Sequence, residues 1–312
     1  MSADLSPNLQ AKIADAERIL KEAVETHLGD KHTLVANCVL FSGGNDSSTL
    51  ADLMVRLGVA THAIHANTTI GIEATRQFVR DRCAAMGLPL LEKTPEKSYR
   101  DHVLAHGFPG PGQHFKMYQQ LKERGLRMAR RELVQNGRKQ RVLFIAGRRK
   151  AESTRRSSIP EHERVDSVIW ASPLANWTKE DLQEYREHFA VPRNTVADEL
   201  GMSGECLCGA FAEPGELERI GHLHPEVAAE IQELEVDVLA TGNVVEERCM
   251  WGWGAYRGTE APSKTGPLCS SCDFRSDPAK RVKLTDEQQS NVTDAFQRIL
   301  ARRAARELER AA

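Results

Sequence analysis

Residues 38–57 read CVLFSGGNDSSTLADLMVRL, and this stretch decides the fold. Residues 38–41 form a short apolar run that stops before two glycines, as a buried parallel strand does. Residues 47–57 then have the spacing of a helix, which Gly58 ends. Because the first amides of a helix are unpaired and lie at its positive dipole end, this strand, turn and helix predict an anion site.

The turn between the strand and the helix suits a nucleotide polyphosphate. Gly43 and Gly44 let the backbone approach a phosphate closely, and Asp46 can cap the helix and help to hold Mg²⁺. No lysine follows the glycines, so the turn is not the GxxxxGK[ST] loop. A plain strand-to-helix turn is the alternative interpretation. The expected contacts with ATP in this turn are Phe41, Ser42, Gly43, Gly44, Asp46, Ser47 and Ser48.

Strand and helix patterns alternate along most of the chain. Apolar runs at 60–65, 87–91 and 142–146 predict strands, and 73–86 predicts a helix. This alternation predicts an α/β fold with a doubly wound, mostly parallel sheet. We expect an N-terminal helix over 1–30, the nucleotide-binding domain over 31–199, an irregular cysteine-rich, metal-binding region over 200–280 and a C-terminal helical tail over 281–312.

The charges of the 312-residue chain are unevenly distributed, although the net charge is only −2. Residues 116–156 hold 14 Lys and Arg against 3 Asp and Glu, a local net charge of +11. Such a segment either solvates helix surfaces or attracts a polyanion, which would be a nucleotide triphosphate or a nucleic acid. Just before it, the Gly- and Pro-rich residues 106–115 predict a mobile loop.

The composition is that of a soluble globular protein, with 28% charged and 40% hydrophobic residues. No apolar run approaches the roughly 20 residues that a membrane-spanning helix needs. The first residues lack the basic start and apolar core of a secretory signal. We therefore expect a cytoplasmic protein with no membrane contact.

The seven cysteines predict metal ligands and buried thiols rather than disulfides in a reducing compartment. Cys38 and Cys83 fall on a predicted strand and helix, where we expect inert, buried thiols. The other five lie in the last third of the chain. A CxxC with a second close pair is typical of zinc or iron–sulfur sites, which need four ligands or fewer, and unliganded thiols are the alternative. The expected metal ligands are Cys206, Cys208, Cys249, Cys269 and Cys272.

Four ordered stretches resemble a known family. The turn at 42–47 resembles the SGGxDS loop of the adenine-nucleotide α-hydrolase group, the PP-loop ATP pyrophosphatases. Within that group the chain looks most like the phosphoadenylyl-sulfate (PAPS) reductase family over residues 38 to about 212. Thr69 departs from the family pattern, because glycine is usual there. The other similar stretches are IHANTTIGIEATRQFV (64–79), GRRKAESTRR (147–156) and PLANWTKEDLQEYREHFAVPRN (173–194).

The resemblance extends the expected site beyond the first turn. Residues 147–156 match G-x-R-x-x-E-S-x-x-R, and arginines that follow a strand end suit phosphate oxygens. His65 could touch adenosine, with a structural histidine as the alternative, while Trp177 and Tyr185 are expected in the core. The added nucleotide contacts are His65, Asn67, Gly147, Arg148, Arg149, Glu152 and Arg155, and the expected catalytic residues are Asp46, Arg148 and Arg155.

The resemblance implies an ATP pyrophosphatase that uses Mg²⁺, adenylates an acceptor with release of pyrophosphate, and takes part in iron–sulfur-assisted sulfur transfer. A [4Fe–4S] cluster is favoured because iron–sulfur relatives are common in the family, and Zn²⁺ is the alternative. The implied partner is an adenine nucleotide. Nucleic acid (DNA or tRNA) and a sulfur-donor protein remain open, as does the oligomeric state.

Two other functions remain open. A PAPS or adenylyl-sulfate reductase, a thiol-dependent oxidoreductase, needs a nucleophilic cysteine in a C-terminal Glu-Cys-Gly-[LI]-His segment. Here no cysteine follows Cys272, and the pair Glu205-Cys206 lies upstream of the last predicted helix. The third possibility is a non-catalytic, metal-bearing nucleic-acid-binding module that retains only the nucleotide loop.

Overall fold

The computed structural model describes residues 5–152, 156–213 and 215–254. These residues form one six-stranded sheet with the order β3-β2-β1-β4-β6-β5. Neighbouring strands are parallel except β5 and β6, so the prediction of an α/β fold with a mostly parallel sheet is confirmed. The strands are β1 (Thr33–Leu40), β2 (His62–Ala66), β3 (Leu90–Lys93), β4 (Gln140–Ile145), β5 (His162–Val165) and β6 (Val168–Ala171).

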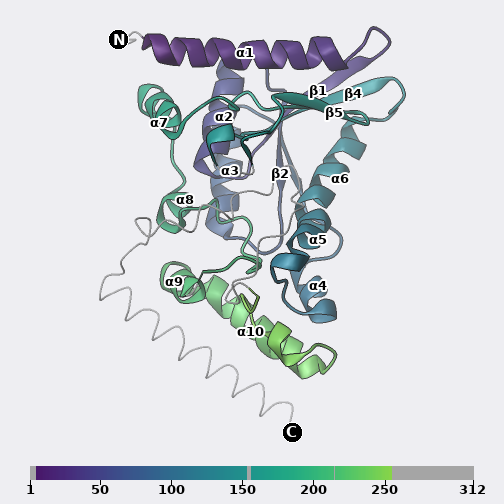
Figure 1. Ribbon diagram of the computed structural model, residues 1–312, viewed down its shortest axis with the longest axis vertical. Helices are drawn as coiled ribbons and strands as arrows, with labels where there is room; N and C mark the ends of the chain where they lie inside the picture. Colours follow the sequence, from purple (N-terminus) through teal and green to yellow (C-terminus); the bar gives the residue numbers. More distant parts are fainter. Residues whose placement is uncertain (1–4, 153–155, 214, 255–312) are drawn as a thin grey trace.

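Helices cover both faces of the sheet, with α2 and α3 on one side and α5 and α6 on the other (Figure 1). Side chains alternate between the faces of a strand, so Val39 enters the core under α1, α2, α3 and α7 while Leu40 enters the core under α6. These helices are α1 (Pro7–His27), α2 (Asn45–Arg56), α3 (Glu73–Ala85), α5 (His114–Tyr118), α6 (Arg124–Leu133) and α7 (Lys179–His188).

The residues expected to be structural are buried in these cores. Trp177 and Tyr185 have no exposed surface, which confirms their prediction as core residues. Burial raises the pKa of the Cys38 thiol to about 12 and that of Cys83 to about 11. Both thiols therefore stay protonated and unreactive near neutral pH, as predicted.

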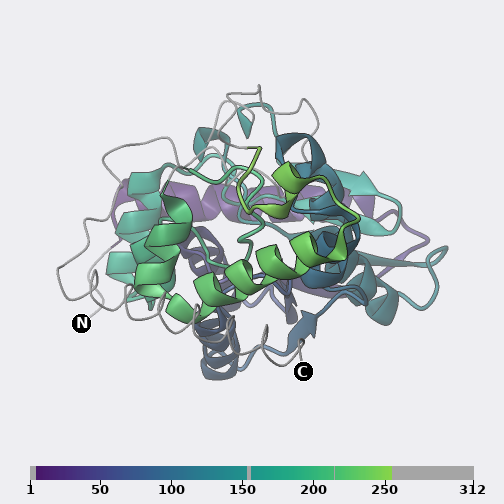
Figure 2. The same cartoon turned by 90° about the horizontal axis from the view of Figure 1, so that it is seen from below.

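A third core lies beyond the sheet, where α4 (Tyr99–His106), α9 (Glu216–Leu223) and α10 (Pro225–Thr241) pack together. Figure 2 shows α10 running across this end of the molecule. The prediction of an irregular region over 200–280 is therefore wrong for its described part. No described helix meets the length and apolarity that crossing a membrane requires. The predicted tail over 281–312 lies outside the described residues.

The prediction of a mobile loop over 106–115 is also wrong. Residues 107–111 are buried, and Phe108 has no exposed surface. Its amide donates to the carbonyl of Arg248 at 2.8 Å, and Trp253 Nε1 donates to the Phe108 carbonyl at 2.8 Å. The glycines and prolines therefore allow close packing here, with Gly110 and Pro111 against Gly254.

Candidate nucleotide-binding site

The sheet has a switch point between β1 and β4. From β1 the chain continues through β2 and β3 toward one edge of the sheet, and from β4 it passes to β5 at the other edge and returns to β6 beside β4. Ligands of doubly wound proteins bind outside the carboxyl ends of the strands at such a point. Residues 41–44 and 146–149 follow these two ends, and residues from both segments line a cavity of about 450 Å³. This volume is typical of small-molecule sites.

The turn after β1 is held open toward this cavity. Gly43 adopts a φ of +81°, and its carbonyl accepts a hydrogen bond from Asn194 Nδ2 at 2.9 Å. The hydroxyls of Ser47 and Ser48 both donate to the Gly44 carbonyl, at 2.9 and 3.0 Å. The N-cap residue of α2 is Gly44, which offers no side-chain cap to the first amides of the helix. The first turn of α2 is therefore fixed in place, and its N-cap residue leaves these amides available to an anion.

One ion pair links this turn with the segment after β4, and a second lies within that segment. Arg149 Nε donates to Asp46 Oδ2 at 2.8 Å, and Arg156 pairs with Glu152. Burial raises the pKa of Glu152, an effect that Arg156 partly offsets. Both arginines are the fixed arginines of the G-x-R-x-x-E-S-x-x-R pattern, and both line the cavity. An incoming phosphate can therefore compete with carboxylates for guanidinium groups that are already in place.

Arg148 lies deeper in the wall. It is 3% exposed, donates to Ser172 Oγ at 2.9 Å and lies over the ring of Trp170. Its Nη1 contacts Glu163 at 3.3 Å, while its buried Nη2 has no hydrogen-bond partner among the described residues. Burial lowers the pKa of Arg148, which nevertheless stays cationic at neutral pH.

Three more cations line the cavity from α7 and the segment that follows it. They are Lys179, Arg186 and Arg193, and none was predicted as a site residue. Arg186 Nη1 donates to Thr49 Oγ1 at 3.3 Å, and burial lowers the pKa of Arg186. Arg193 pairs with Asp198 at 2.6 Å beside α8 (Thr195–Leu200). The described cavity wall thus carries more basic than acidic groups near the start of α2.

The opposite wall is largely apolar and belongs to the α6 side of the sheet. Leu40, Ala66 and Leu126 line it, together with Lys122 from the π-helical turn Gln119–Glu123. A π-turn inside a helix often marks a functional site. One wall of the cavity thus suits a flat apolar ring, and the other suits a polyanion.

Nine of the fourteen expected nucleotide contacts line this cavity, and the other five are Gly43, Ser48, His65, Asn67 and Arg155. Gly43 and Ser48 shape the turn without lining the cavity, and Arg155 lies outside the described residues. Arg156 lines the cavity. It belongs to the arginine cluster at 148–156 that was expected to suit phosphate, although it was not among the fourteen expected contacts. The nine are Phe41, Ser42, Gly44, Asp46, Ser47, Gly147, Arg148, Arg149 and Glu152.

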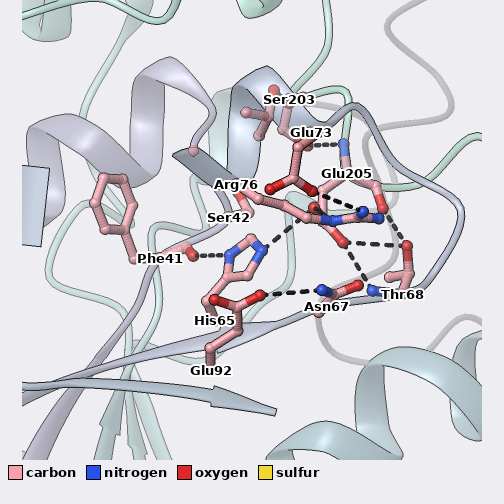
Figure 3. Close-up of polar contacts among 12 residues, drawn as sticks. Phe41, Ser42, His65, Asn67, Thr68, Glu73, Arg76, Glu92, Ser203 and Glu205 are labelled. Carbon is pink, nitrogen blue, oxygen red and sulfur yellow. Dashed lines mark hydrogen bonds and ion pairs between the residues drawn. The ribbon is translucent and has the colours of Figure 1, made fainter. Parts of the chain in front are cut away.

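His65 and Asn67 are not among the residues that line the cavity, and Figure 3 shows the polar contacts that they make instead. His65 is 1% exposed, and its Nδ1 lies 2.8 Å from the Phe41 carbonyl oxygen. Asn67 Nδ2 donates to Glu92 Oε1 at 3.0 Å. The position of His65 is therefore that of a structural histidine, which was the alternative interpretation. Its neighbour Glu205, rather than His65 itself, lines the cavity.

The described cysteines of the last third share one core with Tyr99 and Trp251. The Tyr99 hydroxyl donates to the Cys208 carbonyl at 2.9 Å, and burial raises the pKa of Tyr99. Within the described ranges no group of three or more His, Cys, Asp or Glu side chains forms a metal site. Cys269 and Cys272 lie outside those ranges, so the predicted ligand set remains a prediction.

Comparison with known proteins identifies the family. The model of the phosphoadenosine phosphosulfate (PAPS) reductase domain matches residues 36–224, more than half of the chain. The chain belongs to this family. The adenosine 5′-phosphosulfate reductase of Mesorhizobium japonicum is 29% identical to the chain over 100 residues, 30% of this chain and 39% of that protein. This PAPS reductase family member thus spans well under half the length of that relative.

Solved structures superpose on this PAPS reductase family member only in part. PAPS reductase from Candida auris, in a phosphate complex, has a TM-score of 0.42 and 19% identity over 64% of this chain and 94% of that one. NMN synthetase from Francisella tularensis has a TM-score of 0.38 and 18% identity over 72% and 94%. The U34-tRNA thiolase NcsA from Methanococcus maripaludis, solved with its [4Fe-4S] cluster, has a TM-score of 0.34 and 14% identity over 84% and 88%.

Proposed function

We propose that this member of the PAPS reductase family is an ATP pyrophosphatase that adenylates an acceptor and supports sulfur transfer. The observation that carries the proposal is the group of cations around the start of α2, whose N-cap residue is Gly44. Besides Arg148, Arg149 and Arg156, this wall presents Lys179, Arg186 and Arg193. A triphosphate carries about four negative charges at neutral pH, and guanidinium groups bind its oxygens in pairs.

In this proposal the adenine lies on the apolar wall near Leu40 and Leu126, and the polyphosphate lies along the α2 turn. Asp46 is 31% exposed and accepts from Arg149, so its carboxylate suits Mg²⁺, which would neutralise phosphate charge when bound. The acceptor oxygen forms a bond to the α-phosphorus, and the bond from that phosphorus to the bridging oxygen breaks. Arg149 and Arg186 stabilise the charge that develops on the departing pyrophosphate.

The sulfur step is the second half of the proposal. A sulfur nucleophile forms a bond to the activated carbon of the acceptor, the carbon–oxygen bond breaks, and AMP leaves. Cys206 and Cys208 lie near the cavity because Glu205, which precedes them, lines it. The described residues do not complete a ligand set for a [4Fe–4S] cluster or Zn²⁺, so we assign no step to either group.

Nucleic acid is the acceptor class that we propose, with a sulfur-donor protein as the source of sulfur. The basic segment 116–156 supports this choice through its local net charge of +11. Sulfonucleotide reduction is the second candidate, and the position of Cys206 one residue beyond the cavity favours it. In that reaction a thiolate attacks the sulfur of the sulfonucleotide, the nucleotide leaves, and a second thiol releases sulfite.

Pyrophosphate release tests the first candidate against the second. The purified protein receives Mg–ATP with total tRNA or plasmid DNA, and pyrophosphate is measured. We expect release that depends on the acceptor, that Asp46→Ala abolishes and that the exposed control Glu25→Gln retains. Sulfite formation from adenosine 5′-phosphosulfate or PAPS with thioredoxin, without pyrophosphate from ATP, would establish the reductase instead.

A further inference from the structure

Residues 203–207 connect the nucleotide cavity with the cysteine segment. Ser203 and Glu205 line the cavity, and Cys206 follows directly. The segment is fixed along the turn at 70–75, because Ile72 N donates to the Gly204 carbonyl at 2.9 Å and Leu207 N donates to the Ile70 carbonyl at 2.9 Å. The cysteine segment therefore begins inside the wall of the nucleotide site.

The side-chain carboxylate of Glu205 also holds this segment in place through its contacts with Thr68, His65 and Arg76 (Figure 3). The residue is 1% exposed, and its Oε1 accepts from the Thr68 amide at 2.7 Å. Its Oε2 lies 3.3 Å from His65 Nε2 and 3.5 Å from Arg76 Nε. A carboxylate that is buried among these partners moves only together with them, because separating it from them would leave charges unpaired at low dielectric.

His65 continues this chain of contacts to the nucleotide loop. Its Nδ1 lies 2.8 Å from the Phe41 carbonyl oxygen, which can only accept, so Nδ1 carries a hydrogen. Its Nε2 lies 3.3 Å from Glu205 Oε2, a close polar contact between two buried side chains. Phe41 itself lines the cavity and begins the loop. Close polar contacts thus join Phe41, His65 and Glu205.

We propose that Glu205 is a positioning residue that couples nucleotide occupancy of the loop to the reactivity of Cys206. The idea rests on the proposed nucleotide binding. Because interiors are close-packed, a ligand that displaces the Phe41 carbonyl displaces His65 and the Glu205 carboxylate with it. The loop also lies close to this segment at a second place, because a Cβ added to Gly44 would lie 3.2 Å from Ser203 Cβ. The backbone of Glu205 then carries the shift to Cys206.

The test measures the alkylation of Cys206 by iodoacetamide in anaerobically purified protein, with and without saturating Mg–ATP. Peptide mass spectrometry gives the rate at Cys206, and calorimetry gives the affinity for Mg–ATP. In the wild-type protein we expect Mg–ATP to change the rate at least about fivefold. Glu205→Gln keeps the shape of the side chain and removes its charge, so at Mg–ATP concentrations that saturate this variant it should lose most of the response.

Glu92→Gln is the matched control, because Glu92 belongs to the same polar network but pairs with Asn67 and Arg80. It should keep the wild-type response. If circular dichroism shows that Glu205→Gln does not fold, His65→Gln interrupts the same series of contacts from Phe41 to Glu205. This variant must then lose the response of the Cys206 alkylation rate to Mg–ATP. A response retained in either folded variant overturns the coupling. Wild-type protein that binds Mg–ATP with an unchanged Cys206 rate also overturns it, whereas absence of Mg–ATP binding overturns the proposed function itself.

Discussion

Replacing Gly43 by alanine tests the loop on which the nucleotide site is built. Gly43 has a φ of +81°, in the left-handed region that side chains disfavour. A Cβ at this position would lie 2.7 Å from Thr75 Cγ2 and 3.1 Å from Val79 Cγ2. Both neighbours are fully buried on α3, so they cannot move aside freely. Alanine therefore meets backbone strain and overpacking together.

The backbone strain costs about 1–2 kcal/mol and the overpacking about 1–3 kcal/mol, so Gly43→Ala should lower the free energy of unfolding by about 2–5 kcal/mol. For a chain of this size the loss lowers Tm by roughly 5–15 °C. Gly147→Ala is the matched control, since its added Cβ would meet nothing nearer than 3.5 Å, at Asp46. Its Tm should stay within about 2 °C of wild type. Equal Tm values for the two variants in thermal unfolding followed by circular dichroism would refute the loop geometry.

Three further predictions concern other parts of the chain. Thr69 has a φ of +61°, and its hydroxyl accepts a hydrogen bond from the Tyr99 amide at 2.7 Å. In urea unfolding, Thr69→Gly should have a free energy of unfolding about 1 kcal/mol higher than Thr69→Ala. A higher free energy of unfolding for Thr69→Ala would contradict the backbone strain at this position. A hydrogen bond from Asn176 lowers the pKa of Glu161 from 4.5 to about 2. The ionised Glu161 carboxylate therefore stabilises the fold by about 1 kcal/mol after solvent screening, and this stabilisation is complete above pH 4.5 and lost as pH falls toward 2. Glu161→Gln should remove this loss of stability between pH 4.5 and 2, as measured by unfolding at each pH. Arg186→Met should weaken Mg–ATP binding about tenfold in calorimetry and AMP binding less, and equal losses would place the polyphosphate elsewhere.

The sheet and the loop could be predicted because their signals are local. The run at 38–41, the two glycines and the following helix occur in one short stretch, and each part depends on its own residues. The same holds for Cys38 and Cys83, whose burial follows from the elements that carry them. Thr69, which stands where glycine is usual in the family, has a φ of +61° in the structure, and this backbone conformation was not predicted.

The rest of the site could not be predicted because long-range packing forms it. Lys179 and Arg186 lie on a stretch whose resemblance was clear, yet nothing local shows that they face the loop after β1. His65 was expected to touch the nucleotide because it follows a strand. Its contact with Glu205 joins residues 140 positions apart in the sequence, and no periodicity reveals such a pair.

The strand β5 and the helix α10 were not predicted, and the reason differs between them. The edge strand β5 reads His-Glu-Arg-Val and has no apolar side, so neither alternation nor an apolar run marks it. In α10, by contrast, Val227, Ile231, Leu234 and Val238 are buried at helical spacing. That signal was available in the sequence, and the cysteines on either side of it led to the wrong interpretation.

The central claim is that the cavity between the ends of β1 and β4 binds a nucleoside polyphosphate. Titration calorimetry of wild-type protein and Arg149→Met with Mg–ATP tests it most directly. We expect saturable binding at one site per chain, weakened about tenfold in the variant, because Arg149 lies at the turn and pairs with Asp46. No binding by the wild-type protein, or equal binding by both proteins, would contradict the claim.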